Sequence, residues 1–280
     1  MKTDDKTALV LEGGGLRGVF TCGVLDCFMD HGIVVDKCYG ISAGGINGAS
    51  YVSNQRGRSL YFWKECVTDK RYGNVRNLLK TGMYFIETPE VKLEPLDKEA
   101  FNNSKMKFEI GVTCVETGVC DYIEIEDADE VDELVTASAS LPIFSRFSLI
   151  RGKYYLDGGL SDSIPCKRAL DDGCDKVICI LTQHKGFVKK KTKSYPIVKA
   201  KYRRYPKLVE AIGKRHEMYN EQLEHIYSLD PSMCLVIQPK EPVEVDRLEK
   251  NKEKLMKLYE EGYQDALSRI DEIKAFINNN

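Results

Sequence analysis

The sequence contains no long, uninterrupted apolar run. None of its stretches approaches the roughly 18 apolar residues that a membrane-spanning helix needs. The first 15 residues lack the apolar centre of a secretory signal peptide, because Glu12 and three glycines interrupt them. We therefore expect a cytoplasmic protein, and peripheral contact with a membrane stays open as an alternative.

Histidine is scarce, and the ten cysteines form no Cys-x-x-Cys pair. None of the four histidines has the spacing of a metal site; they are His31, His184, His216 and His225. Three cysteines lie inside apolar, strand-like runs, where a reduced thiol acts as a small hydrophobic side chain; they are Cys114, Cys179 and Cys234. We therefore expect reduced thiols, no metal ion and no cofactor.

The 280 residues are 42% hydrophobic and 30% charged, which is typical of a globular domain with a sizeable core. Their apolar patterns predict strands at residues 8–11, near 39, at 107–115, 119–125, 154–156, 177–181 and 234–237. They predict helices at residues 17–31, from 46 onward, at 131–139 and at 246–277, the last interrupted at Gly262. Strands interleaved with helices predict an α/β fold with three α/β/α layers and a mostly parallel central sheet.

Ser42 lies in the run Gly40-Ile41-Ser42-Ala43-Gly44, between a predicted strand and a predicted helix. A sharp turn at such a place exposes a serine hydroxyl, and flanking glycines prevent clashes. The start of the following helix favours developing negative charge. The pattern indicates a nucleophile on an elbow formed with Gly40, Ala43 and Gly44, and a glycine-rich surface turn is the alternative.

A glycine-rich loop follows the first predicted strand and opens the first predicted helix. Its backbone N–H groups could converge on an anion; the loop consists of Gly13, Gly14, Gly15, Leu16, Arg17 and Gly18. A dinucleotide-binding loop of this spacing should be followed, about 20 residues on, by an acid that ends the second strand. Ser42 and its elbow stand there instead, so we interpret the loop as an oxyanion hole and keep nucleotide binding as the alternative.

A serine hydroxyl needs a base to become a good nucleophile. Ser42 follows the second strand, too early for the histidine triad of an α/β-hydrolase, and no histidine has a suitable place. Asp157, in Asp157-Gly158-Gly159, follows a short apolar strand, which would bring its carboxylate to the carboxyl edge of the sheet. Asp157 is therefore the candidate base, and a surface Asp-Gly turn is the alternative.

In this order, the glycine loop, the Ser42 elbow and the Asp-Gly-Gly block resemble the three signature blocks of the patatin-like phospholipase family. Residues 137–144 also resemble the stretch that precedes the third block in that family. The resemblance covers about residues 8–181, and the remainder is only loosely similar to the C-terminal part of bacterial members.

The resemblance implies a patatin-type fold and metal-independent hydrolysis of acyl esters in lipids, hence lipid degradation. It implies a catalytic dyad without histidine, in which Ser42 is the nucleophile and Asp157 the general base. The alternatives are an acyltransferase or thioesterase with the same dyad, and a non-catalytic module that binds lipid or nucleotide. We expect a catalytic core at residues 1–185 and, at residues 186–280, a basic segment and a helical region with a further strand near 233–238.

Residues 185–207 contain ten lysines and arginines and no acid, although the whole chain has a net charge of −2. Within residues 189–207 the cations are interspersed with three tyrosines, Tyr195, Tyr202 and Tyr205, and Phe187 lies just before them. Aromatic rings of this kind suit a membrane interface. The segment could contact an anionic membrane, since each cation near the surface contributes about 1 kcal/mol. A solvated face is the alternative, the acidic net charge disfavours nucleic acid, and no feature fixes the oligomeric state.

Overall fold

The computed structural model describes residues 6–66, 68–69, 74, 76–77, 94–246 and 249–278. The strands are β1 (Thr7–Leu11), β2 (Lys37–Ile41), β3 (Lys107–Cys114), β4 (Cys120–Glu124), β5 (Ser148–Ile150), β6 (Lys153–Asp157), β7 (Lys176–Ile180) and β8 (Cys234–Ile237). The α-helices are α1 (Gly18–Asp30), α2 (Ala43–Val52), α3 (Arg58–Tyr61), α5 (Lys98–Asn102), α6 (Val131–Ser138), α7 (Cys166–Asp171), α8 (Tyr195–Lys201), α9 (Pro206–Ser228), α10 (Lys252–Ser268) and α11 (Ile270–Asn278). The shorter turns are the 3₁₀ turns η1 (Gly15–Arg17), η3 (Ala128–Glu130) and η4 (Gly158–Leu160) and the π turn η2 (Phe62–Cys66).

The strands of the described ranges form one sheet in the order β5-β6-β3-β2-β1-β7-β8, and β4 also pairs with β3. Its central strands, from β3 through β2, β1 and β7 to β8, are all parallel. Strands β4 and β6 are antiparallel to β3, and β5 is antiparallel to β6. The predicted mostly parallel sheet is therefore confirmed.

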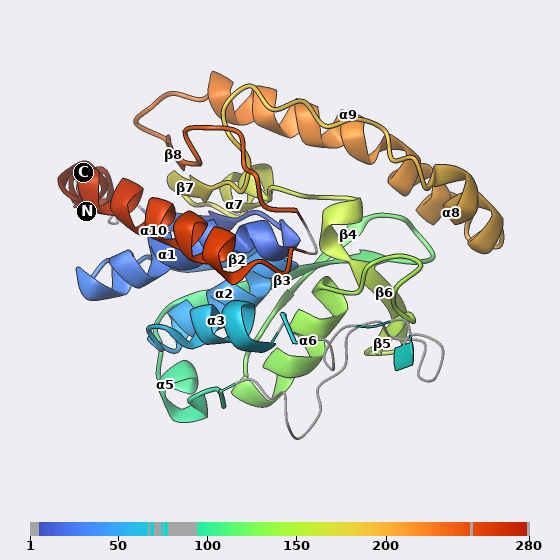
Figure 1. Ribbon diagram of the computed structural model, residues 1–280, viewed down its shortest axis with the longest axis horizontal. Helices are drawn as coiled ribbons and strands as arrows, with labels where there is room; N and C mark the ends of the chain where they lie inside the picture. The colour runs from blue at the N-terminus through green and yellow to red at the C-terminus, as the bar shows by residue number, and fades with distance from the viewer. Residues whose placement is uncertain are drawn as a thin grey trace.

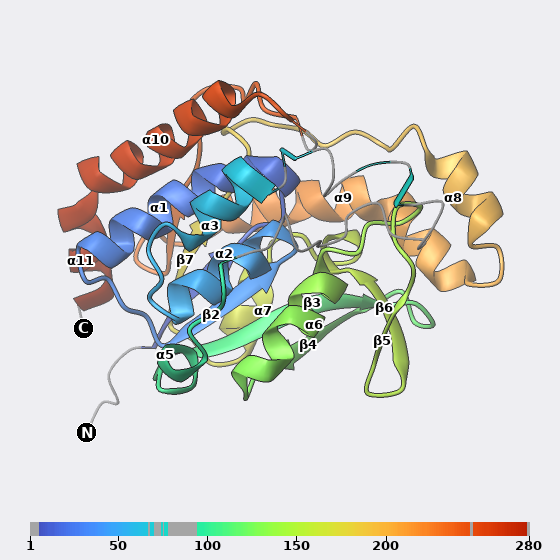
Figure 2. The ribbon, with the colours of Figure 1, turned by 60° about the horizontal axis from the view of Figure 1, so that its bottom comes forward.

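The two faces of the sheet are covered by different helices. Leu9 and Leu11 of β1 belong to an apolar cluster with residues of α1, α2, α6 and α10, whereas Ala8 and Val10 belong to a second cluster with residues of α7 and α9. Successive side chains of a strand point to opposite faces, so continuous apolar strands such as β1 and β7 are those buried on both sides. Figure 2 shows the sheet between these helices, which confirms the predicted three layers.

Helices α1 and α10 run side by side on the outside of one layer (Figure 1). Each has a glycine where the other approaches: a Cβ added at Gly23 would overlap the Tyr259 carbonyl, and one at Gly262 would overlap the Phe20 carbonyl. The hydroxyl of Tyr259 also donates to buried Asp26, over 2.8 Å. Burial raises the pKa of the Asp26 carboxyl, which the hydrogen bond from Tyr259 partly offsets.

The C-terminal helical pattern differs in detail from its prediction. Helix α10 begins at Lys252, and the break falls at Arg269, between α10 and α11, not at Gly262. Gly262 serves the close approach of α1 instead. Leu248, part of the predicted helix, lies outside the described residues. No helix within the described ranges has the length and apolar character of a membrane span.

Gly262→Ala should lower the free energy of unfolding by about 1–3 kcal/mol, because a methyl group has no room against the α1 backbone. Thermal or urea unfolding measures this loss. Gln264→Ala changes an exposed position of the same helix and should stay within about 0.5 kcal/mol of the unchanged protein. Equal stability of the two variants would contradict the close helix contact.

Candidate active site

Ser42 lies between the last residue of β2 and the first residue of α2. Its backbone has φ 54° and ψ −116°, a conformation that favours glycine and costs a serine about 1–3 kcal/mol. The flanking glycines are needed for packing: a Cβ at Gly40 would lie 2.7 Å from the Gly45 Cα, and one at Gly44 would overlap the Leu11 carbonyl. The turn therefore has the form of a nucleophile elbow, with its serine 9% exposed.

A buried hydroxyl holds this turn in place. The Ser42 N–H donates to Ser138 Oγ over 2.8 Å, and Ser138 Oγ donates to the Gly111 carbonyl over 2.7 Å. Ser138 ends α6 and is fully buried, and its two hydrogen bonds link the turn at Ser42 to β3. The sequence pointed to the stretch 137–144 but not to this contact, because Ser138 lies 96 positions from Ser42.

Asp157 is the last residue of β6 and is 2% exposed. Its N–H donates to the Ser140 carbonyl over 2.9 Å, and its Oδ1 accepts from the Gly159 N–H over 2.8 Å. These bonds fix both the backbone and the carboxylate of Asp157.

The sheet register brings Asp157 and Ser42 to the same place. Ile41, just before Ser42, is opposite Gly111 of β3, and Asp157 is opposite Val112, the next residue of that strand. A Cβ added at Gly159 would lie 3.0 Å from Asp157 Oδ1 and 3.5 Å from Ile41 Cγ2. The carboxylate therefore lies beside the residue that precedes Ser42.

The glycine loop joins the same group. A Cβ at Gly13 would lie 3.1 Å from the Cβ of Ser42 and 3.1 Å from Ile41 Cγ2. Gly15, with φ 59°, begins turn η1, which leads directly into α1. Gly18 has another function: its N–H donates to the Gly15 and Leu16 carbonyls, and a Cβ there would lie 2.8 Å from the Cβ of Ala43. The structure thus places Gly13 beside Ser42 and Gly18 in the packing of α1 on α2.

A buried acid supports the loop, and the sequence analysis did not identify its function. The Glu12 carboxylate accepts from the Thr182 N–H over 2.6 Å and from the Tyr219 hydroxyl over 2.9 Å. Burial, with the nearby charge of Glu12, raises the pKa of the Tyr219 hydroxyl, and the positive charge of Arg17 opposes that rise. Glu12, which directly precedes Gly13, therefore links the end of β1 to the residues after β7 and to α9.

No histidine of the described ranges forms a hydrogen bond with Ser42 or Asp157. His31 contacts the Cys27 carbonyl at the end of α1, and His216 lies on α9, 3.7 Å from Glu217. The assignment of the base to Asp157 rather than to a histidine stays a prediction.

Three thiols that are far apart in the sequence meet on the face of the sheet covered by α7. The Sγ atoms of Cys166, Cys179 and Cys234 all lie within 4.8 Å of one another, and all three residues are buried. Soft ions such as Zn²⁺ and Cu(I) prefer thiolate ligands. In the part of the chain that the structure describes, no fourth histidine, cysteine or carboxylate joins them, and they pack within the apolar cluster. The expected absence of a metal stays a prediction.

Comparisons with known proteins show which family the sequence matches. Residues 9–170 match the patatin-like phospholipase family, and residues 205–278 match a domain of unknown function, DUF6363. The uncharacterized protein YjjU of Escherichia coli K12 is 28% identical over 191 residues, which are 63% of this chain and 52% of YjjU. The lysophospholipase NTE1 of Lodderomyces elongisporus is 25% identical over 188 residues, which are 64% of this chain but only 12% of NTE1.

Among solved structures, VipD from Legionella pneumophila aligns with a TM-score of 0.47 at 14% identity, over 96% of this chain and 67% of that one. The first family match alone covers more than half of the sequence and contains Ser42, Asp157 and the glycine loop. This chain belongs to the patatin-like phospholipase family.

Proposed function

We propose that the protein hydrolyses carboxylic ester bonds of lipids with Ser42 as nucleophile and Asp157 as general base. The observation that carries this proposal is the strained Ser42 turn, which lies between the glycine loop and the Asp157 strand end. A serine is held in such a backbone conformation only where the surrounding structure determines it, and such positions cluster at active sites.

In the proposed reaction, Ser42 Oγ attacks the ester carbonyl while the Asp157 carboxylate accepts its proton. The proton then passes to the leaving alcohol, and water releases the acyl group by the same route. A carboxylate is a weaker base than the imidazole of a histidine triad. The reaction therefore depends on positioning, which the Gly159 and Ser140 hydrogen bonds to Asp157 support.

The developing oxyanion would be stabilised by backbone N–H groups of the loop from Gly13 through Arg17. The Gly18 N–H is already bonded within η1, so we leave it out of the oxyanion hole that the sequence predicts. The start of α1 adds its positive dipole end to these donors. The hydrogen bond from the Thr182 N–H to the Glu12 carboxylate would hold the start of this loop in place.

We also propose that one end of the molecule contacts an anionic membrane. Helix α8 and the β5–β6 hairpin lie at this end in both ribbon views (Figures 1 and 2), and it is called the α8 end below. It carries large apolar side chains that are exposed to solvent: Phe144, Leu149, Tyr154 and Ile197. The segment that includes α8 also carries exposed lysines, among them Lys191 and Lys199.

One of the residues predicted to contact the membrane is placed otherwise. Tyr202 is buried, its hydroxyl accepts from the Ile143 N–H over 2.9 Å, and its ring packs on Phe147. It belongs to the core under α8, so the apolar contact would come from Ile197 and from Leu149 and Tyr154 of the β5–β6 hairpin instead.

Ser42→Ala and Asp157→Asn should each lower kcat/KM for phospholipid and p-nitrophenyl ester hydrolysis by about a thousandfold or more, because each removes one half of the dyad. Product analysis separates hydrolysis from acyl transfer. Asp171→Asn, an exposed aspartate of α7, should keep full activity. Activity retained in either dyad variant would contradict the proposed mechanism.

Ser138→Ala should lower kcat more than it changes KM, because the Ser42 N–H loses its buried acceptor and the elbow is less well positioned. It should also lower the free energy of unfolding by about 1–3 kcal/mol. Ser228→Ala removes a comparable serine-to-carbonyl hydrogen bond at an exposed position and serves as control. An unchanged kcat in Ser138→Ala would show that the hydrogen bond is not needed for positioning.

Co-sedimentation with phosphatidylglycerol vesicles should exceed that with phosphatidylcholine vesicles. Lys199→Glu changes the local charge by two, which corresponds to about 2 kcal/mol of binding free energy. It should therefore weaken binding to the anionic vesicles by roughly thirtyfold. Lys257→Glu makes the same charge change on α10 and should have little effect. Equal binding to both vesicles, or equal losses in the two variants, would exclude docking through the α8 end.

A further inference from the structure

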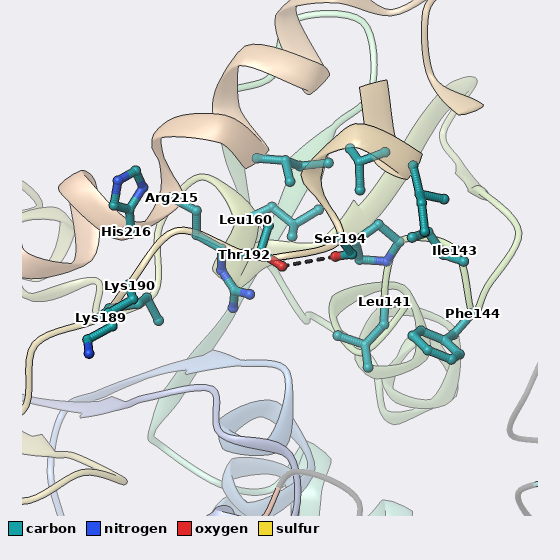
Figure 3. Close-up of a pocket in the computed structure, with 14 residues that line it drawn as sticks. Leu141, Ile143, Phe144, Leu160, Lys189, Lys190, Thr192, Ser194, Arg215 and His216 are labelled. Atoms are coloured by element: carbon teal, nitrogen blue, oxygen red, sulfur yellow. Dashed lines mark hydrogen bonds between the residues drawn. The ribbon is translucent and has the colours of Figure 1, made fainter. Parts of the chain in front are cut away.

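A cavity of about 510 Å³ opens beside the turn that carries Asp157 (Figure 3). Its volume falls in the range of about 300–1,000 Å³ that is typical of small-molecule sites. One wall is apolar and includes Leu141, Ile143, Leu160 and Ile212. In the view of Figure 3, Lys189 and Lys190 lie at one end of the cavity and Leu141, Ile143 and Phe144 at the other, with Arg215 and Leu160 between them.

Several of the residues that line the cavity are direct neighbours of the proposed dyad. Leu160 ends turn η4, which begins right after Asp157, and Leu141 follows the residue whose carbonyl accepts from the Asp157 N–H. Arg215 of α9 donates through Nε to the Gly159 carbonyl, while the Gly159 N–H donates to Asp157 Oδ1. The cavity is therefore next to the turn that holds the Asp157 carboxylate, although neither Asp157 nor Ser42 lines it.

The charged side chains that line the cavity are cationic: Lys189, Lys190 and Arg215 line it, and none of the described residues that line it carries a carboxylate. The Asp157 carboxylate lies next to Arg215, because a Cβ added at Gly159 would lie 3.0 Å from Asp157 Oδ1 and 3.2 Å from Arg215 Nη2. His216 also lines the cavity, and its Nε2 lies 3.7 Å from Glu217 Oε1.

The cationic end is fixed to α9. The Lys189 N–H donates to Asn220 Oδ1 over 2.9 Å, and Asn220 Nδ2 donates back to the Lys189 carbonyl over 3.1 Å. The Lys189 ammonium lies 3.4 Å from the centroid of the Tyr219 ring, within the range of a cation–π interaction. Because its backbone and its side chain are both held, Lys189 has little freedom to lose when an anion binds.

We infer that this cavity binds the lipid substrate with its chain against the apolar wall and its phosphate at Lys189, Lys190 and Arg215, and selects lipids whose head group is net anionic. The inference rests on the proposed lipid hydrolysis at Ser42. A choline head group neutralises its own phosphate and would bring a cation toward three others, whereas a glycerol head group leaves the phosphate charge uncompensated.

The same inference gives a function to part of the C-terminal segment. Helix α9 contributes Ile212 and Arg215 to the cavity, and both lie within residues 205–278, which match a domain of unknown function. In this arrangement the signature blocks supply the reacting groups, and the C-terminal segment supplies the side of the site that recognises the lipid.

The test uses two single-chain phospholipids with the same short acyl chain, one with a glycerol and one with a choline head group, both below their micelle concentration so that no membrane is present. Binding is measured by calorimetry on full-length Ser42→Ala, and kcat/KM on the unchanged protein. We expect about tenfold or greater preference for the glycerol lipid, since a hydrogen bond to a charged group carries about that factor.

Lys189→Gln with Lys190→Gln should remove this preference mainly by raising KM for the anionic lipid. Lys193→Gln, an exposed lysine of the same segment that does not line the cavity, should keep it. Equal affinity for both lipids in Ser42→Ala, or equal losses for both in the double variant, would overturn the inference. Selective binding without any hydrolysis by the unchanged protein would instead support the subsite and contradict the proposed function.

Discussion

The pairing of β3 with two different neighbours is the constraint on which the site depends. Gly111 is opposite Ile41 of a parallel strand, and Val112 is opposite Asp157 of an antiparallel one, so two strand ends of opposite direction meet on consecutive residues. A slip of one residue would turn the side chains of a strand to the other face of the sheet. The register is pinned at Gly158, where a Cβ would overlap the Gly111 carbonyl.

Around this register the backbone comes unusually close to itself, and that closeness explains the residue types of the signature blocks. The strained Ser42 turn fits because Gly40 and Gly44 have no side chains to collide with the neighbouring backbone. Ser138 then supplies the acceptor that the buried Ser42 N–H needs. An aspartate is a weak base, so a rigid arrangement of this kind is what the proposed chemistry requires.

The layers, the parallel sheet and the place of Ser42 between strand and helix could be predicted, because they follow from local periodicity and from short motifs. The connections of Glu12 with Tyr219 and of Arg215 with Gly159 could not, because they join positions far apart in sequence and have no spacing signature. The helix break was misplaced at Gly262 for a related reason: a glycine weakens a helix locally, but here tertiary contact with α1 requires it.

These long-range connections change the interpretation of the C-terminal region, which the sequence presents as a basic segment and a helix that packs on a core. Helix α9 contacts the candidate site at two separate points: Tyr219 bonds Glu12 below the glycine loop, and Arg215 bonds the Gly159 carbonyl beside Asp157. A displacement of α9 would therefore disturb the loop and the carboxylate together. Because the same helix lines the cavity, the proposed lipid site and the proposed dyad would both be positioned by one element.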